Sequence, residues 1–207
     1  MNATARRLLA VVAMAIIATL TLSACAGFAA FGESVNRAFH GVSATMTTYT
    51  QAGYLIDEVH GKSFQVSRDT RFDTSNSDGT SKNDSSVLMI SLGTNHISHV
   101  GSTMVLAQEG LTPVAGATTT IRFENTEPGT PWLNNFLEYN RNLWAGKAKV
   151  IMVRSQDGTP IAVYAGNQVE ILATDVPKST WFRVDSKYLL VYRADYTVYD
   201  SELLTSE

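Results

Sequence analysis

The stretch that decides the fold reads Lys149-Val150-Ile151-Met152-Val153-Arg154, then Gln156-Asp157-Gly158, then Ile161-Ala162-Val163-Tyr164. Its two apolar runs are rich in β-branched residues and predict strands, and the Asp-Gly pair between them predicts a tight hairpin turn. Similar runs follow at 169–172, 181–184, 188–192 and 196–199, separated by turn residues. Residues 146–200 are therefore predicted to form an antiparallel meander.

The first half of the chain carries the same kind of pattern. Strand-like runs cover residues 42–49, 54–59, 63–66, 87–92, 97–100 and 103–107. Gln51-Ala52-Gly53 predicts a turn, and Gly61 predicts a break between two strands. Residues 73–86 contain no apolar residue and predict a long solvated loop.

We expect a mainly β fold in which antiparallel meanders form a sandwich or a small barrel, as one domain over residues 42–200. The connector at 110–130 contains one further candidate strand, 119–123. One amphipathic helix is expected at about 131–145, because Pro131 suits a first helical position and Gly146 suits the end. One face of this helix would consist of Leu133, Phe136, Leu137, Asn140, Leu143 and Trp144, and it is apolar except for Asn140.

The halves 42–109 and 146–200 share a spacing that suggests an internal repeat. At an offset of 105 residues, Gly41, Gln51, Gly53, Ile56 and Gly61 meet identical residues at 146, 156, 158, 161 and 166. Glycines at fixed offsets from an apolar alternation are typical of the same turns on the same strands. Two unrelated hairpins that share turn residues would explain the matches as well.

The N-terminus has the features of a lipoprotein signal over residues 1–24. Arg6 and Arg7 precede residues 8–22, which carry no charge and are too few for a membrane span. Leu22-Ser23-Ala24-Cys25 follows and resembles the bacterial lipobox, and Cys25 is the single cysteine of the chain. A diacylglyceryl group on the Cys25 thiol would anchor the protein, with residues 25–41 as a tether. An uncleaved span that continues through residue 31 is the alternative.

The net charge of the chain argues against nucleic acid as a partner. The chain has 16 Lys and Arg against 19 Asp and Glu, a formal net charge of −3, and cleavage before Cys25 would make the charge more negative. No basic face is expected, so binding to nucleic acid is not predicted.

The histidines do not predict a metal site. His96 and His99 are three positions apart, an odd spacing, so on a regular strand they point to opposite faces. His40 and His60 have no acidic or cysteine partner at ligand spacing. In the 73–86 loop, Asn76, Asp78 and Asp84 surround Gly79, but the EF-hand pattern fails because Thr74 and Ser85 would occupy its first and last ligand positions. A looser calcium site stays open there.

No motif predicts catalysis or a cofactor. Gly61-Lys62-Ser63 lacks the earlier glycine of a phosphate loop, since Ile56 occupies that position. Glu124, Glu127 and Glu138 have the spacing of surface carboxylates. The aromatic residues of the last third either form core or offer a β face to sugar or peptide; they are Trp181, Phe182, Tyr188, Tyr192, Tyr196 and Tyr199. Tyr188 and Tyr192 share a face of a regular strand.

The chain resembles a family of small uncharacterised lipoproteins of Gram-positive bacteria, classed as a domain of unknown function. The resemblance rests on residues 149–154, 160–164, 176–182 and 191–200, and on the pattern from Gly41 to Lys62. It implies anchoring through Cys25 and a single domain, and it brings no catalytic residues. The 73–86 loop has the character of an insertion.

We therefore expect a membrane-anchored, extracytoplasmic lipoprotein whose β domain is not an enzyme and binds a protein or a cell-envelope component, such as a glycan. No cofactor is expected. The alternatives are a solute-binding lipoprotein of a transport system, which the absence of βαβ alternation disfavours, and a small envelope hydrolase, which would need a cleft with paired carboxylates.

Overall fold

A computed structural model describes residues 35–116, 142 and 144–204. These residues belong to one compact unit of the chain, Val35–Glu207. One short helix, α2, spans Val35–Ala38, and two 3-10 turns, η1 and η3, span Thr70–Phe72 and Ser201–Leu204. The strands are β1 (Ser43–Tyr49), β2 (Leu55–Lys62), β3 (Phe64–Arg68), β4 (Leu88–Leu92), β5 (Asn95–His99), β6 (Thr103–Gln108), β7 (Ala115–Gly116), β8 (Lys149–Arg154), β9 (Pro160–Gly166), β10 (Val169–Leu172), β11 (Ser179–Val184), β12 (Lys187–Tyr192) and β13 (Asp195–Asp200).

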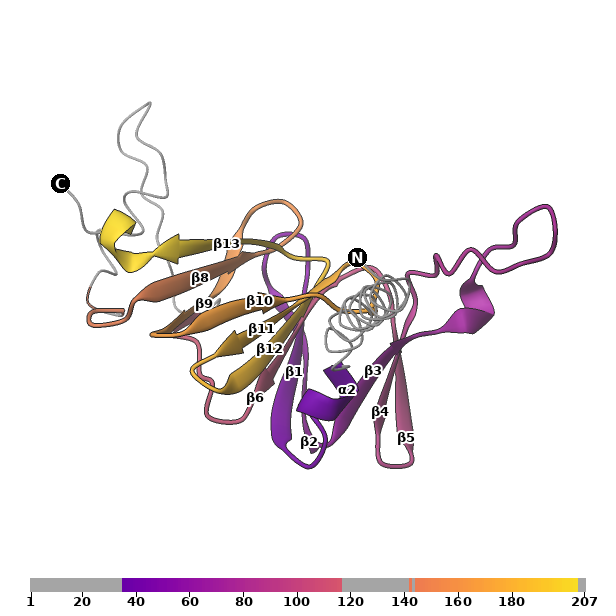
Figure 1. Ribbon diagram of the computed structural model, residues 1–207, viewed down its shortest axis with the longest axis horizontal. Coiled ribbons are helices and arrows are strands. Elements are labelled where there is room, and N and C mark those ends of the chain that lie inside the picture. Colours follow the sequence, from indigo (N-terminus) through magenta and orange to yellow (C-terminus); the bar gives the residue numbers. More distant parts are fainter. Residues whose placement is uncertain (1–34, 117–141, 143, 205–207) are drawn as a thin grey trace, which may run out of the picture. The chain divides into compact units, whose positions relative to one another are not determined.

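The described strands form three antiparallel sheets (Figure 1). The central sheet has the order β10-β11-β12-β6-β1-β2, the second has the order β13-β8-β9-β7, and the third is β3-β4-β5. The predicted antiparallel pairing is confirmed. The strands of the second half do not form one meander, however, because β8, β9 and β13 lie in the second sheet and β10, β11 and β12 lie in the central sheet. Among the described strands no sheet closes on itself, so the architecture is a sandwich rather than a barrel.

The central sheet has an apolar core on each face. On one face, even-numbered residues of β6 and β12 pack with β3 and β4; this core includes Met104, Leu106, Leu190, Tyr192, Phe64, Val66, Leu88 and Ile90. On the other face, odd-numbered residues of the same strands pack with β8 and β9; this core includes Val105, Leu189, Val191, Ile151, Val153 and Ile161. Because successive side chains of a strand alternate between faces, β6 and β12 are buried on both sides, in the middle of three layers.

The two predicted halves have the same strand pairing. In the first, β1 pairs with β2 and β6, and β3, β4 and β5 form a meander. In the second, β8 pairs with β9 and β13, and β10, β11 and β12 form a meander. This common strand order is what the repeat hypothesis requires.

The registers of the halves coincide as well. The pair Thr48↔Asp57 corresponds to Val153↔Ala162 at the offset of 105. The register shifts directly after these pairs, between Thr48 and Tyr49 in β1 and between Val153 and Arg154 in β8. The pair Phe64↔Leu92 corresponds to the pair Val169↔Val184. Phe64 and Val169 are 105 positions apart, whereas Leu92 and Val184 are only 92 positions apart. The connection that contains residues 73–86 is therefore longer by 13 residues than its counterpart in the second half.

Gly61 lies inside β2, and the predicted break falls two residues later, at Ser63, whose φ is 60°. A Cβ at Gly61 would lie 2.0 Å from Leu92 Cδ2, and a Cβ at the equivalent Gly166 would lie 2.7 Å from Val184 Cγ1. Leu92 and Val184 are themselves equivalent. Each glycine thus gives room to an apolar side chain from the other sheet of its half.

Several predicted features lie outside the described residues: Cys25 and the tether up to residue 34, the strand at 119–123, and the helix at 131–145 apart from Asn142, Trp144 and Ala145. The part of the tether that is described contains α2, whose Val35 joins the core. Across the described ranges, no helix is long and apolar enough to cross a membrane.

Candidate binding groove

A groove of about 360 Å³ lies over the face of β6, β1 and β2 that carries Tyr49. The segment 109–113, which follows β6, forms its far wall, and β9 contributes one residue. The lining residues are Thr45, Thr47, Tyr49, Leu55, Glu58, His60, Ala107, Gln108, Glu109, Gly110, Leu111, Thr112, Pro113 and Tyr164.

The alternation of β1 builds the floor of the groove. Ala44 and Met46 point into the core shared with β3 and β4, so Thr45, Thr47 and Tyr49 point to the opposite face. The Thr47 hydroxyl reaches back to the Val105 carbonyl at 3.4 Å. The floor is therefore a row of hydroxyl groups on a sheet that is packed from behind.

Glu58 and His60 of β2 stand directly opposite Thr47 and Thr45. A hydrogen bond of 2.8 Å joins Thr45 Oγ1 and His60 Nδ1, and one of 2.9 Å joins His60 Nε2 and Glu58 Oε1. The side chains of His60 and Glu58 are 69% and 49% exposed. This chain of polar groups is held in place by cross-strand pairing but remains in contact with solvent.

Two tyrosines close the inner end of the groove. Burial raises the pKa of Tyr49, a hydrogen bond with Thr47 acts against this rise, and the negative charge of Glu58 adds to it. Burial also raises the pKa of Tyr164, together with the influence of Tyr49. Both phenols therefore stay protonated over the physiological range, and the Tyr49 O–H lies within the influence of the Glu58 carboxylate.

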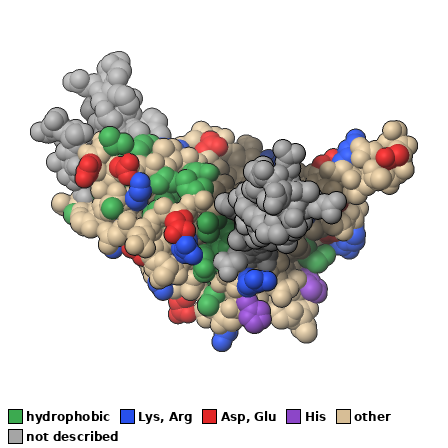
Figure 2. All heavy atoms as spheres, viewed as in Figure 1, with side chains coloured by type: hydrophobic (Ala, Val, Ile, Leu, Met, Phe, Trp, Pro, Cys, Tyr) green, Lys and Arg blue, Asp and Glu red, His purple; other side chains and the backbone are tan. Residues whose placement is uncertain are grey.

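The far wall is fixed by the backbone and by Lys187. The Glu109 N–H donates to the Ser43 carbonyl at 2.8 Å, and Lys187 Nζ donates to the Glu109 carbonyl at 3.1 Å. Two acidic residues, Glu58 and Glu109, line the groove, and no Lys or Arg among the described residues does. Elsewhere charges of both signs are interspersed, as on the face drawn in Figure 2. A cationic group with hydrogen-bonding capacity complements this lining.

The order Thr45, His60, Glu58 has the connectivity of a nucleophile, a base and an orienting carboxylate. The exposure of His60 is that of a surface residue, however, and a catalytic base works best where water is excluded. No group of three His, Cys, Asp or Glu side chains within the described residues is placed to hold a metal ion.

The remaining histidines make separate contacts. His96 Nδ1 lies 2.9 Å from Ser91 Oγ, whereas His99 Nε2 lies 3.0 Å from the Ser102 carbonyl oxygen. The His99 ring also meets the Tyr192 ring edge to face, with centroids 5.5 Å apart. His40 is exposed beside the end of α2.

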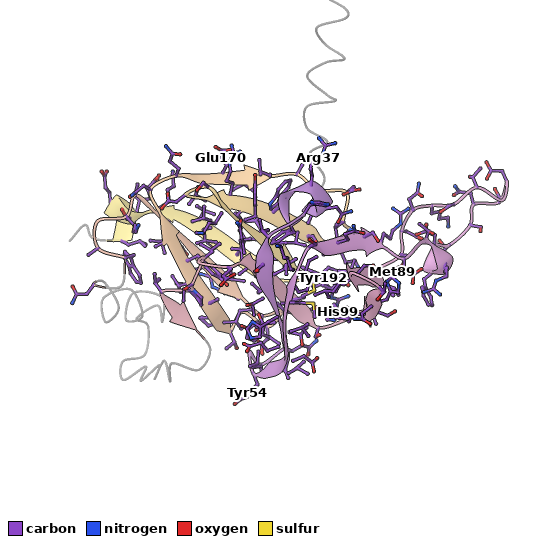
Figure 3. The ribbon with its side chains drawn as sticks, turned by 90° about the horizontal axis from the view of Figure 1, so that it is seen from below. Arg37, Tyr54, Met89, His99, Glu170 and Tyr192 are labelled. Carbon is purple, nitrogen blue, oxygen red and sulfur yellow. The ribbon has the colours of Figure 1, made fainter. Side chains whose placement is uncertain are left out.

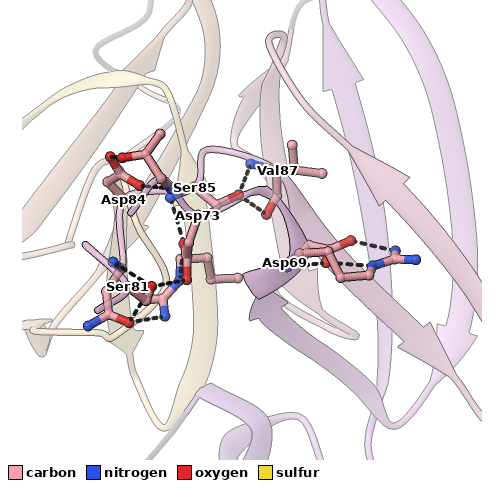
Figure 4. A network of polar contacts seen from close by, with 10 residues as sticks. Asp69, Asp73, Ser81, Asp84, Ser85 and Val87 are labelled. Atoms are coloured by element: carbon pink, nitrogen blue, oxygen red, sulfur yellow. Dashed lines mark hydrogen bonds and ion pairs between the residues drawn. The ribbon is translucent and has the colours of Figure 1, made fainter. Parts of the chain in front are cut away.

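The polar side chains of the 73–86 loop bind the loop itself. Asp78 Oδ1 accepts from the Thr80 N–H and hydroxyl, at 2.9 and 2.6 Å, and Asp84 accepts from Thr74 in the same way. At the base, Asp73 accepts from the Ser85 N–H at 2.9 Å and pairs with Arg68 at 3.0 Å (Figure 4). These carboxylates order the loop rather than converge on one point.

The aromatic residues of the last third serve the core. Tyr188 and Tyr192 contact the same core, and Tyr188 meets Trp181 with ring centroids 5.2 Å apart. Tyr196 meets Phe182 edge to face at 4.9 Å. Glu124, Glu127 and Glu138 lie outside the described residues. The groove residues Thr45, Thr47, Tyr49 and Glu58 were not predicted, although alternating threonines beside Ala44 and Met46 are a signal for a polar strand face.

No curated protein and no solved structure matches the chain. A family model does match, over residues 6–204, which is almost the whole sequence. The model's family is described as a domain of unknown function, DUF5052. The chain belongs to this family of proteins with a domain of unknown function.

Proposed function

We propose that the protein is a bacterial lipoprotein, held by Cys25 at the extracytoplasmic face of the cell membrane, whose β domain binds a partner without catalysing a reaction. The support for the anchor is the order of Arg6 and Arg7, the uncharged residues 8–22 and Leu22-Ser23-Ala24-Cys25. Two acyl chains on one cysteine give a stable anchor without a transmembrane helix. The resemblance to lipoproteins of Gram-positive bacteria belongs to this proposal.

The groove carries the proposal for binding. It combines tyrosine and threonine hydroxyls with Glu58 and Glu109, and within the described part of the chain its lining contains no Lys or Arg. Such a lining favours amine or guanidinium groups, which occur on basic segments of proteins and on amine-bearing envelope components. Leu55 and Leu111 at the rim add apolar contact.

A hydrolase is the second candidate, and the Thr45–His60–Glu58 hydrogen-bond chain is the observation that favours it. Thr45→Val separates the two functions, since it removes the hydroxyl but keeps the shape of the side chain. Hydrolytic activity that is lost in Thr45→Val while partner binding persists would support the hydrolase. The solute-binding alternative has less support, because the described sheets are all antiparallel.

The test is photo-cross-linking in intact cells. A photoreactive residue at Leu111, on the rim of the groove, should capture a defined partner, and one at exposed Ile171 on β10 should not. Cys25→Ala should abolish capture by releasing the protein from the membrane, and a double variant, Glu58→Gln with Glu109→Gln, should reduce it while the protein stays anchored. Equal capture from both positions, or none from Leu111 in anchored protein, would contradict the proposal.

A further inference from the structure

The internal repeat exposes a difference between equivalent strands. The outer edge of β9 is paired with β7, through Ala115↔Val163 and Gly116↔Ala162. The equivalent strand in the first half is β2, and Glu58 and Asp57 correspond to Val163 and Ala162 at the offset of 105. No described strand pairs with the outer edge of β2. A position that takes an added strand in one half is thus unpaired, among the described residues, in the other.

The backbone of β2 is oriented for such an addition. The Asp57 N–H donates to Thr48 Oγ1 at 3.2 Å, so it points toward β1. Because N–H and C=O groups alternate sides along a strand, those of Glu58 point away from β1. The equivalent Val163 uses its carbonyl in this direction, accepting from the Val114 N–H at 2.7 Å. The outer edge of β2 therefore presents a donor and an acceptor at Glu58.

Side chains along β2 indicate what would pair there. Tyr54, Leu55 and Ile56 are 73%, 44% and 49% exposed, and Tyr54 lies at the outer end of the β1–β2 hairpin (Figure 3). Asp57 and Glu58 follow directly. A second copy of β2 in the register that places Glu58 opposite Glu58 would bring like charges close together, which disfavours that self-pairing. An incoming strand with a cationic residue opposite Glu58 and apolar residues next to Leu55 and Ile56 complements the edge.

We propose that β2 binds an extended, basic segment of a partner protein by strand addition, in the way that β9 binds β7. Backbone hydrogen bonds at Glu58 would hold the segment, and a Lys or Arg opposite Glu58 would select it. This inference rests on the proposed binding function, because the same Glu58 lines the groove beside the edge.

Amide hydrogen exchange on the full chain, as the Cys25→Ala variant, tests whether the edge is free. The Glu58 amide should exchange rapidly at low and high protein concentration, while the equivalent Val163 amide exchanges slowly. Slow exchange of Glu58 at both concentrations would mean that another segment of the chain covers β2. Protection that grows with protein concentration would mean that a second copy covers it. Either result overturns the proposal.

A matched pair of peptides then tests the occupant. The probe acetyl-Val-Lys-Val-Lys-Val-amide should slow exchange at Glu58 and His60, and the same peptide with Glu in place of Lys should not. Shifts of the Thr45 and Thr47 resonances without protection of β2 would overturn strand addition but leave groove binding intact. Absence of both responses would overturn both proposals. Equal protection by the two peptides would overturn the claim for a basic segment.

Discussion

Gly61 shows how one missing side chain lets two sheets approach each other. A Cβ there would overlap Leu92 Cδ2, at 2.0 Å. We predict that Gly61→Ala lowers the free energy of unfolding by about 1–3 kcal/mol, because Leu92 must move away from the strand. Chemical denaturation measures this change. In a Leu92→Ala background the substitution should cost much less, and an equal cost in both backgrounds would show that the close contact is not the cause.

Asp69 links the stability of the fold to pH. Its carboxylate, 2% exposed, accepts from Arg71 Nε at 2.9 Å and from Arg71 Nη2 at 2.6 Å, and these hydrogen bonds hold the pKa of Asp69 below its ordinary value of 3.8. A lowered pKa in the folded state stabilises the protein above the unfolded pKa. That contribution is lost as pH falls through 3.8 toward the folded value.

We therefore predict that Asp69→Asn is less stable than the native protein near neutral pH and loses less stability on acidification from about pH 5 to about pH 3. Urea denaturation across this range measures the difference. Asp175→Asn, at an exposed position, is the control and should follow the native curve. A native-like acid slope in Asp69→Asn would rule out the Asp69–Arg71 pair as a source of the pH dependence.

Single residues were predictable from the sequence where neighbours along the chain decide their environment. The even spacing of Tyr188 and Tyr192 predicted a common face, and both contact one core. The groove was not predictable in this way. Thr45 meets His60 because of the register of the β1–β2 ladder, and Tyr164 comes from the other half of the chain.

At the scale of elements, the positions of the turns were predictable from the local sequence, but the assignment of strands to sheets was not. Gly53 and Gly158 have φ values of 80° and 88°, as turn glycines do, and the hairpins on either side of them were predicted. The assignment of strands to sheets depends on the pairing of β6 with β12, two strands far apart in sequence. β6 and β12 are central because their side chains are apolar on both faces. A short apolar run in the sequence does not show which of the buried strands lie at the centre of a sheet.

The loop at 69–87 has a base that contributes to the stability of the fold and a tip that does not. Tyr192, which is fully buried, donates from its hydroxyl to the Ser86 carbonyl at 2.6 Å, whereas the hydrogen bonds of residues 76–80 are exposed. We predict that replacing residues 76–80 with two glycines changes the free energy of unfolding by less than about 0.5 kcal/mol. Tyr192→Phe should cost about 1 kcal/mol or more, because it leaves the Ser86 carbonyl without its donor. Thermal denaturation compares the two, and the reverse order of costs would contradict this division.

In the whole molecule, the two halves with similar strand pairing do not form two independent bodies. The central sheet combines β6, β1 and β2 of the first half with β10, β11 and β12 of the second, and each face of it belongs to a different core. Neither half can therefore complete its packing without the other. The halves share a topology, yet the pairing of β6 with β12 joins them into one folding unit.

Leu190 lies at this junction, opposite Leu106 of β6 and fully buried. We predict that Leu190→Ala lowers the free energy of unfolding by about 2–5 kcal/mol. Because both halves depend on the central sheet, the slowest-exchanging amides of β4 in the first half and β8 in the second should lose the same amount of protection. Ile171→Ala, at a half-exposed position on β10, should leave both sets nearly unchanged. Loss of protection confined to β4 would mean that the halves unfold separately, and that the repeat consists of two domains that happen to share a sheet.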